Sequence, residues 1–182
     1  CYCDVSNLYG SPAAVARWGR FYSFSTGAGL SAKPVLEGMS RGGLIIFNWA
    51  SANPAKVRAI YGDNPVCNFR SWPGGDGGKR SDGDWKRCLA AYGIEETAAG
   101  EVRQPRDVET LKPIAAKRVP LFLVLGEADE VVPVAHNAGP LAEAYRELGG
   151  PVRLWRKPGV GHHPHGLDPV APLLDAILAT AP

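Results

Sequence analysis

The apolar run at residues 119–125 constrains the fold of this chain more than any other segment. Its sequence, VPLFLVL, contains no polar residue, whereas a strand with one solvent-facing side alternates apolar and polar residues. Continuous apolar strands of this length are typical of parallel sheets that are buried on both faces. The run therefore predicts a buried strand of a parallel sheet.

Other strand-length and helix-length segments alternate with this run along the chain. Ser11 can cap a first helix and Pro12 suits its first turn, whereas Asn53-Pro54 ends a second one. The patterns predict strands at 34–37, 57–61 and 152–155, and helices at 12–22, 41–52, 84–92, 107–117, 135–148 and 169–179. This alternation predicts an α/β fold, with a mostly parallel sheet and crossover helices.

Ser40 lies in the segment GMSRG at residues 38–42, directly after the strand predicted at 34–37. A Gly-x-Ser-x-Gly segment between a strand and a helix places its serine on a sharp, strained turn that exposes the hydroxyl to substrate. We expect Gly38 and Gly42 to be required, because a side chain at either position would collide with the strand or the helix. An ordinary glycine-rich turn is the alternative interpretation of this segment alone.

An acid and a histidine follow the serine, each just after a predicted strand. Asp129 lies in the turn after 119–125, and His162 follows the glycine-rich turn after 152–155. Because the loops at the carboxyl ends of parallel strands meet at one edge of the sheet, we expect Ser40, Asp129 and His162 to converge there. Their order suits a nucleophile, an orienting acid and a base. Asp63, at the end of a neighbouring strand, is the reserve acid.

Three motifs together resemble the α/β-hydrolase family: GMSRG at 38–42, GEAD at 126–129 with a following Val132-Pro133, and GVGH at 159–162. The resemblance spans about residues 12–180. It implies a truncated α/β-hydrolase fold with helices on both faces of the sheet. It also implies a Ser40, Asp129 and His162 triad that works through an acyl-enzyme, with no cofactor.

The chain departs from this family on the N-terminal side of the nucleophile. Family members normally place three or four strands there, but only 39 residues precede Ser40. Those strands usually carry the second oxyanion-hole donor, whose loss typically costs about 10²–10³ in rate, whereas the backbone N–H of Arg41 is the first donor. A compact natural variant is one explanation. The start at Cys1-Tyr2-Cys3, without an initiator methionine, leads us to expect a truncated or processed chain.

The arginine inside the elbow suggests a substrate class. The Arg41 guanidinium could bind a substrate carboxylate or add positive charge to the oxyanion hole. The Ser-Arg elbow resembles that of the glucuronoyl esterases, and this resemblance implies a carbohydrate-linked ester as substrate. An exposed arginine in a surface salt bridge is the alternative. Met39 and His163 are further candidates for contact with substrate.

The segment at about 64–83 is expected to be a loop or lid inserted beside the site. Trp72 could stack on a flat, apolar part of a substrate, and Phe69 could help to form the wall of the pocket. The alternative is that both rings anchor an extended loop on the core.

The four cysteines bear on the cellular compartment. Cys67 and Cys88 lie on either side of a glycine-rich loop that a disulfide could close, as in a secreted protein. We therefore expect this disulfide and an extracellular or periplasmic location. Two buried free thiols in a cytoplasmic enzyme are the alternative. Cys1 and Cys3 are too close for an ordinary bridge, and they form a poor zinc site without a second spaced pair.

The histidine-rich segment HHPH at 162–165 raises the question of a metal. Pro164 prevents a helical pair of histidines, and no His-Glu-x-x-His spacing is present. We therefore expect no metal site. His163 and His165 are expected to form hydrogen bonds within the loop or to line the pocket.

Composition is that of a single domain spanning residues 1–182. The net charge is only +2 and the basic residues are dispersed, which argues against a nucleic-acid partner or a membrane-surface helix. No apolar run approaches the 18 residues of a membrane span. The expected partners are a small-molecule or carbohydrate ester and a second copy of the chain, because an open sheet edge favours dimerisation.

Together these features predict a carboxylic ester hydrolase with a serine nucleophile. Esters are favoured over amides because nothing suggests the extended subsite or propeller domain of related peptidases. A serine peptidase of the same fold is one alternative. The other is a catalytically inactive hydrolase-like fragment that acts as a binding or structural module.

Overall fold

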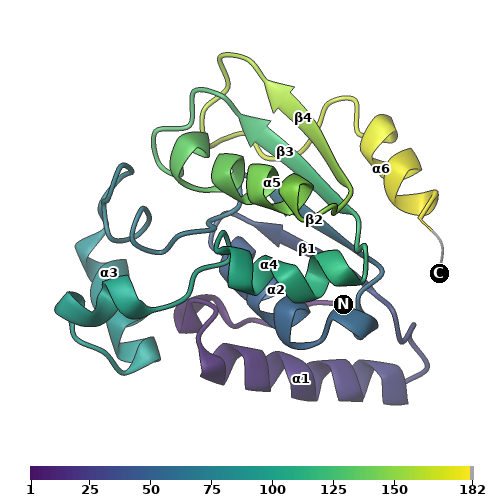
Figure 1. Cartoon of the computed structure of the whole chain (residues 1–182), viewed down its shortest axis with the longest axis horizontal. Helices are drawn as coiled ribbons and strands as arrows, with labels where there is room; N and C mark the ends of the chain where they lie inside the picture. Colours follow the sequence, from purple (N-terminus) through teal and green to yellow (C-terminus); the bar gives the residue numbers. More distant parts are fainter. Residues whose placement is uncertain (181–182) are drawn as a thin grey trace.

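The computed structural model describes residues 1–180 and is built on a parallel sheet of four strands. The strands lie in the order in which they occur in the sequence (Figure 1). They are β1 (Val35–Met39), β2 (Ala59–Asp63), β3 (Leu121–Gly126) and β4 (Val152–Lys157). In the register, Met39 lies opposite Asp63, Asp63 opposite Val124, and Gly126 opposite Lys157. The predicted parallel sheet is confirmed.

One face of the sheet packs against three helices (Figure 1). These are α2 (Gly42–Ala52), α4 (Val108–Ala116) and α5 (Ala138–Glu147). Alternate strand residues point to this face, including Leu36, Ile60 and Leu123, and they form one core with Ile114 and Leu141 of the helices. This core buries Leu121, Leu123 and Leu125 of the apolar run that dominates the sequence.

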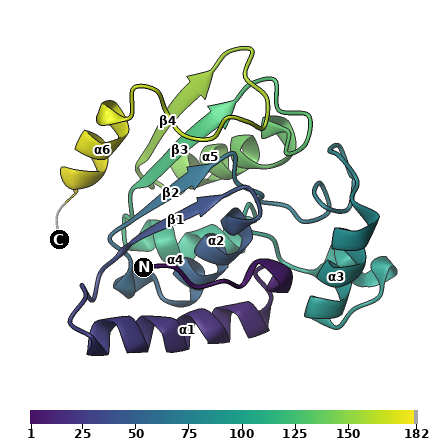
Figure 2. The same ribbon diagram turned by 180° about the vertical axis from the view of Figure 1, so that it is seen from behind.

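The opposite face carries the C-terminal helix α6 (Ala171–Leu178), which Figure 2 shows on the far side of the sheet from α5. Tyr61, Phe122 and Val124 point to this face and pack with Leu173 of α6. The expectation of helices on both faces is therefore confirmed.

Helix α1 (Pro12–Gly27) packs on α2 beside the outer edge of β1. The Trp18 and Tyr22 rings lie 6.2 and 5.4 Å from the Trp49 ring. The helix is one turn longer than predicted. Ser11 does precede it, but the Ser11 side chain forms no capping hydrogen bond and its hydroxyl is buried without a partner. The prediction that the Ser11 side chain caps this helix is therefore wrong, although Pro12 starts the helix as predicted.

Two element boundaries differ from the prediction for local reasons. The second strand starts at Ala59 rather than at residue 57, because Val57 closes a 3₁₀ turn (Pro54–Lys56) by donating its N–H to Pro54 O. The helix expected at 135–148 is divided. A 3₁₀ turn (Val134–His136) leads to Asn137, whose non-helical backbone precedes α5.

Residues 64–81 form an ordered loop that packs on the rest of the chain. Asn137 Oδ1 accepts the backbone N–H groups of Cys67 and Asn68, and Gln104 Oε1 accepts that of Phe69. The loop leads into α3 (Asp82–Tyr92), which is followed by a 3₁₀ segment (Glu96–Glu101). Phe69 is fully buried in a second apolar cluster with Trp85 and other residues of this region. The loop is thus anchored by its aromatic side chains.

Cys67 and Cys88 do not form the expected disulfide, because both are free thiols. Cys67 packs in the main core with residues of the sheet and its helices, whereas Cys88 of α3 packs in the cluster that contains Phe69. Burial raises the pKa of Cys67 and raises that of Cys88 to about 12. Both thiols are therefore protonated core groups, and the cysteine argument for an oxidising compartment no longer holds.

None of the helices in residues 1–180 is both long enough and apolar enough to span a bilayer. The carboxyl ends of the four strands all lie at one edge of the sheet. The loops that leave this edge carry Ser40, Asn64, Asp129 and His162.

Candidate active site

Ser40 sits on a sharp turn between β1 and α2. Its φ of +48° lies in the left-handed region, which is strained for a residue with a side chain. The Ser40 N–H donates to Asp63 O at 2.9 Å, and Ser40 O accepts the N–H groups of Gly43 and Val66. The turn is thus held by backbone hydrogen bonds on both sides, as expected for a nucleophile elbow.

The glycines of the elbow have different roles from those predicted. A Cβ on Gly38 would lie 2.7 Å from Gly42 O, so this glycine is required as expected. A Cβ on Gly42 would meet nothing within 4 Å, and the expectation for this position is wrong. The tight position is the next one, because a Cβ on Gly43 would lie 2.6 Å from Val66 O. The helix approaches the 64–81 loop through Gly43, whereas Gly42 faces open space.

Ser40, His162 and Asp129 form a continuous hydrogen-bonded line. Ser40 Oγ lies 2.9 Å from His162 Nε2, and His162 Nδ1 lies 2.6 Å from Asp129 Oδ2. The other carboxylate oxygen, Asp129 Oδ1, accepts the N–H groups of Val131 and Val132 at 2.9 and 2.8 Å. The three residues predicted from their order in the sequence therefore meet with the geometry of a nucleophile, a base and an orienting acid.

The environment of Asp129 keeps it ionised. Burial acts to raise the pKa of Asp129, but hydrogen bonds from His162 and from the N–H of Val132 outweigh it, so the pKa lies below its ordinary value. An ionised Asp129 holds the proton of His162 on Nδ1 and leaves Nε2 to accept a proton from Ser40.

Asp63, the reserve acid, contacts a different histidine. Its carboxylate is buried and accepts a hydrogen bond from His165 Nδ1 at 2.9 Å, from Tyr61 Oη at 2.7 Å and from the N–H of Gly166 at 2.5 Å. Burial and this carboxylate raise the pKa of Tyr61, which keeps its hydroxyl protonated. Asp63 therefore anchors the loop that carries His162 and does not orient His162 itself.

Asp63 and Asn64 together connect the loops of Ser40, Asp129 and His162, and Asn64 is a residue that the sequence analysis did not identify. Its Nδ2 donates to His162 O at 3.1 Å, and its Oδ1 accepts the N–H of Gly126, at the end of β3, at 2.7 Å. The preceding residue, Asp63, accepts the Ser40 N–H through its carbonyl. Asn64 has a φ of +40°. The only sequence signal was the Asp-Asn-Pro turn after an apolar strand.

Arg41 is held between aromatic rings and an acid. Its guanidinium lies 5.0 Å from the Tyr9 ring centre and 5.2 Å from that of Trp72, and it contacts Asp84 Oδ1 at 3.3 Å and Asn7 Oδ1 at 3.4 Å. The alternative interpretation of Arg41, a salt bridge, is thus present, and its partner is on a helix distant in sequence. The Arg41 side chain retains 28% exposure.

The remaining candidate residues differ in exposure. Met39 is 49% exposed beside the nucleophile, and His163 is exposed next to His162. Trp72 is only 9% exposed, and its ring contacts Arg41. Phe69 is fully buried and does not reach the surface of the site.

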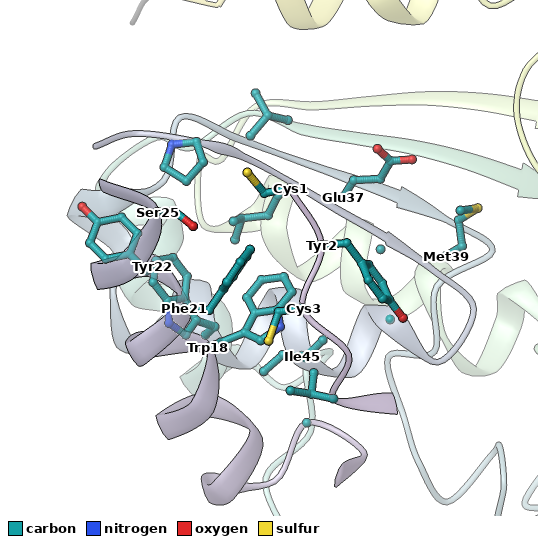
Figure 3. A pocket seen from close by; sticks show the side chains of 18 of the residues that line it. Cys1, Tyr2, Cys3, Trp18, Phe21, Tyr22, Ser25, Glu37, Met39 and Ile45 are labelled. Atoms are coloured by element: carbon teal, nitrogen blue, oxygen red, sulfur yellow. The ribbon is translucent and has the colours of Figure 1, made fainter. Parts of the chain in front are cut away.

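A cavity of about 840 Å³ lies beside Ser40, Asp129 and His162 rather than over them. Figure 3 shows it between α1, which contributes Trp18 and Phe21, the N-terminal segment with Tyr2, and Glu37 of β1. Arg41 also lines it, but Ser40, Asp129 and His162 do not. The cavity follows the edge of β1 that has no neighbouring strand in the described sheet.

No protein-family model matches this sequence, and no curated protein is significantly similar to it in sequence. Solved structures do resemble its fold. A puromycin-hydrolyzing peptidase of Mycobacterium tuberculosis superposes with a TM-score of 0.70 at 17% identity, over 95% of this chain and 25% of that one. Dipeptidyl peptidase 4 of Porphyromonas gingivalis superposes with a TM-score of 0.64 at 14% identity, over 90% and 22%.

An esterase from a Rhodococcus species superposes with a TM-score of 0.55 at 19% identity, over 92% of this chain and 73% of the esterase. The chain thus spans about a quarter of the peptidases and a larger share of the esterase. At these identities the similarity establishes the fold. The four parallel strands, the helices on both faces and the loops at their carboxyl edge are a part of the α/β-hydrolase fold.

Proposed function

We propose that this chain carries the catalytic apparatus of a serine hydrolase that works through an acyl-enzyme. The observation that carries the proposal is the line from Ser40 Oγ through His162 to Asp129, with distances of 2.9 and 2.6 Å, on a turn where Ser40 has a φ of +48°. A serine needs a base within hydrogen-bond reach and an acid that orients the base.

The arrangement supports the following sequence of steps. Ser40 Oγ attacks a substrate carbonyl while its proton passes to His162 Nε2, and Asp129 stabilises the imidazolium that results. The tetrahedral intermediate collapses, the leaving group takes the proton from His162, and the acyl group remains on Ser40. Water then attacks the acyl group, gives its proton to His162 and releases the acid, while the proton returns to Ser40. The backbone N–H of Arg41, next to the nucleophile, is the first oxyanion donor in this scheme.

The test is the intact mass of the protein after incubation with a fluorophosphonate. We expect one adduct per chain on the parent protein and none on Ser40→Ala, because only an activated serine reacts with this reagent. Circular dichroism of both proteins checks that they are folded. Absence of the adduct on folded parent protein would favour the alternative of an inactive binding module.

A carboxylic ester is the preferred substrate, and a peptide or amide is the second candidate. The second candidate gains support because peptidases are among the proteins that share the fold, as does an esterase. Turnover of a matched pair, a p-nitrophenyl ester and the corresponding p-nitroanilide, separates the two. Cleavage of the anilide at a rate similar to that of the ester would contradict the preference for esters.

Arg41 supports a carbohydrate-linked ester, or another ester, that keeps a free carboxylate apart from the group that is cleaved. Arg41 directly follows the nucleophile in the sequence, and its side chain is partly exposed and lines the cavity beside the site. Arg41→Gln should raise KM for a carboxylate-containing ester by more than for a neutral ester of the same alcohol, because only the former loses a charged partner. An equal change for both esters would assign Arg41 a structural role through Asp84.

A further inference from the structure

Three histidines of one loop lie side by side at the candidate active site. The ring centres of His162, His163 and His165 are 4.7 to 5.1 Å apart, and the rings meet nearly at right angles. One nitrogen from each ring lies within 4.8 Å of those of the other two. The prediction of no metal site rested on helical spacing, but an irregular loop gathers these imidazoles without a helix.

Two of the three imidazoles are backed by buried carboxylates. Asp129 accepts from His162 Nδ1 at 2.6 Å, and Asp63 accepts from His165 Nδ1 at 2.9 Å, and neither carboxylate side chain is exposed. A carboxylate on Nδ1 holds the ring proton there, so the lone pair is on Nε2. Histidines that bind metals in proteins show this arrangement, in which a carboxylate fixes the tautomer and raises the basicity of the ring.

We propose that His162, His163 and His165 bind a divalent transition-metal ion of the zinc type, and that this ion inhibits the serine chemistry. Imidazole nitrogen is a preferred ligand of such ions, whereas Mg²⁺ and Ca²⁺ prefer oxygen. His162 and His165 supply Nε2, His163 supplies a ring nitrogen, and a fourth position remains for water.

The rings must approach one another for the ion to bind. Zinc–nitrogen bonds are about 2.0–2.1 Å long, so two ligand nitrogens of one tetrahedral ion lie about 3.4 Å apart. The present nitrogens lie within 4.8 Å of one another. His163 is exposed, so its side chain can rotate toward the other two rings.

Inhibition follows from the use of one atom for two purposes. His162 Nε2 lies 2.9 Å from Ser40 Oγ and is the proton acceptor of the proposed mechanism. Once its lone pair is on the metal, it cannot take the proton of Ser40. This consequence rests on the proposed function, whereas metal binding itself does not.

The binding test uses Zn²⁺ titration calorimetry and the absorption spectrum of the Co²⁺ complex on the full chain. Cys1 is exposed and Cys3 is partly exposed, so both are changed to serine in every protein tested, because free thiolates also bind zinc. We expect one ion per chain. Asp63→Asn should weaken binding by about 10–100-fold, as typical for a residue behind a metal ligand. His163→Ala, at an exposed position, should weaken it at least as much.

The matched control is His136→Gln. His136 is the one histidine of the sequence outside this loop, and its replacement should leave the affinity for Zn²⁺ unchanged. The site is overturned if Zn²⁺ does not bind, or if His163→Ala and His165→Ala bind it as tightly as the parent.

The inhibition test measures the rate of fluorophosphonate labelling of Ser40 with and without saturating Zn²⁺. We expect at least a tenfold slower reaction with the metal, and recovery after EDTA. Unchanged labelling of a protein that binds Zn²⁺ overturns the inhibition. Absence of labelling without metal overturns the proposed function, and the Co²⁺ spectrum still decides whether the site binds a metal. Hydrolysis that requires Zn²⁺ and persists in Ser40→Ala would contradict an inhibitory metal.

Discussion

At the scale of single residues, the two glycines of the elbow motif, Gly38 and Gly42, differ in the space around them. Gly38 faces the backbone of α2 at a distance that excludes a Cβ, whereas Gly42 faces open space. The sequence motif treats the two positions alike, because it records which residues are present and not what surrounds them.

The two glycines make a matched pair of variants. Gly38→Ala should lower the free energy of unfolding by about 1–3 kcal/mol, because its Cβ would lie 2.7 Å from Gly42 O. Gly42→Ala should change it by less than about 0.5 kcal/mol, as for a substitution that meets no other atom. Urea denaturation measures both values. Equal losses in the two variants would contradict the geometry described for the elbow.

The two buried aspartates make a second pair. Asp129→Asn should lower kcat by about 10⁴-fold, because the wrong tautomer of His162 is then held against Ser40. Asp63→Asn should lower kcat by much less, because Asp63 contacts His165. Kinetics on one activated ester compare them, with circular dichroism as a check on folding. A larger loss of kcat in Asp63→Asn than in Asp129→Asn would indicate that Asp63, and not Asp129, is the acid that supports the histidine base.

At the scale of elements, α3 is tied to the elbow by one carboxylate. Asp84 of α3 contacts Arg41 at 3.3 Å and Arg87 at 2.7 Å. Burial acts to raise the pKa of Asp84, but hydrogen bonds from Ser81, Tyr9 and Arg87 lower it to about 2. The folded state therefore prefers the ionised form more strongly than the unfolded chain does.

This preference has a defined pH range. Because the folded pKa is depressed, the stabilisation is complete above the unfolded pKa of about 3.9 and is lost as the pH falls toward about 2. Asp84→Asn should therefore lose less stability than the parent between pH 5 and about 2.5 in urea denaturation. The control is Asp82→Asn, because Asp82 is on the same helix turn but its side chain is 87% exposed. If all three proteins lost the same free energy of unfolding between pH 5 and about 2.5, the interactions of Asp84 with its neighbours would not contribute to stability.

Most elements were predictable because their signals are local. The run at 119–125 and the sites of Pro12 and Pro54 determine where β3, α1 and α2 begin or end, and those boundaries agree with the structure to within a few residues. Contacts between distant residues were not predictable in the same way. The pairing of Asp63 with His165 and the separation of Cys67 from Cys88 depend on how the helices pack, which no local pattern records.

The triad was an exception to that rule. Its members are distant in sequence, but each follows a strand of one parallel sheet, so the topology itself predicts that they meet. Asn64 follows a strand too, yet a turn-forming asparagine has so many uses that its sequence context did not distinguish it.

At the scale of the whole molecule, the open edge of β1 leads us to propose self-association. Within the described sheet, β1 pairs only with β2, and Tyr2, Leu30 and Met39 near this edge are 83%, 50% and 49% exposed. Sheet edges of this kind pair readily with other chains. Sedimentation equilibrium should therefore show a dimer.

A charge placed near the edge should weaken the dimer. Leu30→Lys is expected to shift sedimentation toward the monomer, because a buried lysine is costly at an interface. Leu178→Lys is the control, since Leu178 is 72% exposed but belongs to α6, on the other side of the sheet. A parent protein that is monomeric at all concentrations would contradict the proposal.

The Asp63-Asn64 pair has a consequence for how such a site can change over evolutionary time. One carbonyl, one carboxylate and one amide of these two residues hold the Ser40 turn, the end of β3 and the loop of His162. Two residues of one turn thus hold all three loops, and the loops of Asp129 and His162 are also joined to each other by the hydrogen bond from Ala128 N–H to Val160 O at 3.0 Å. A substitution in this turn would therefore displace all three loops together, so we expect the Asp63-Asn64 turn to tolerate less change over evolution than the loop segments beyond it.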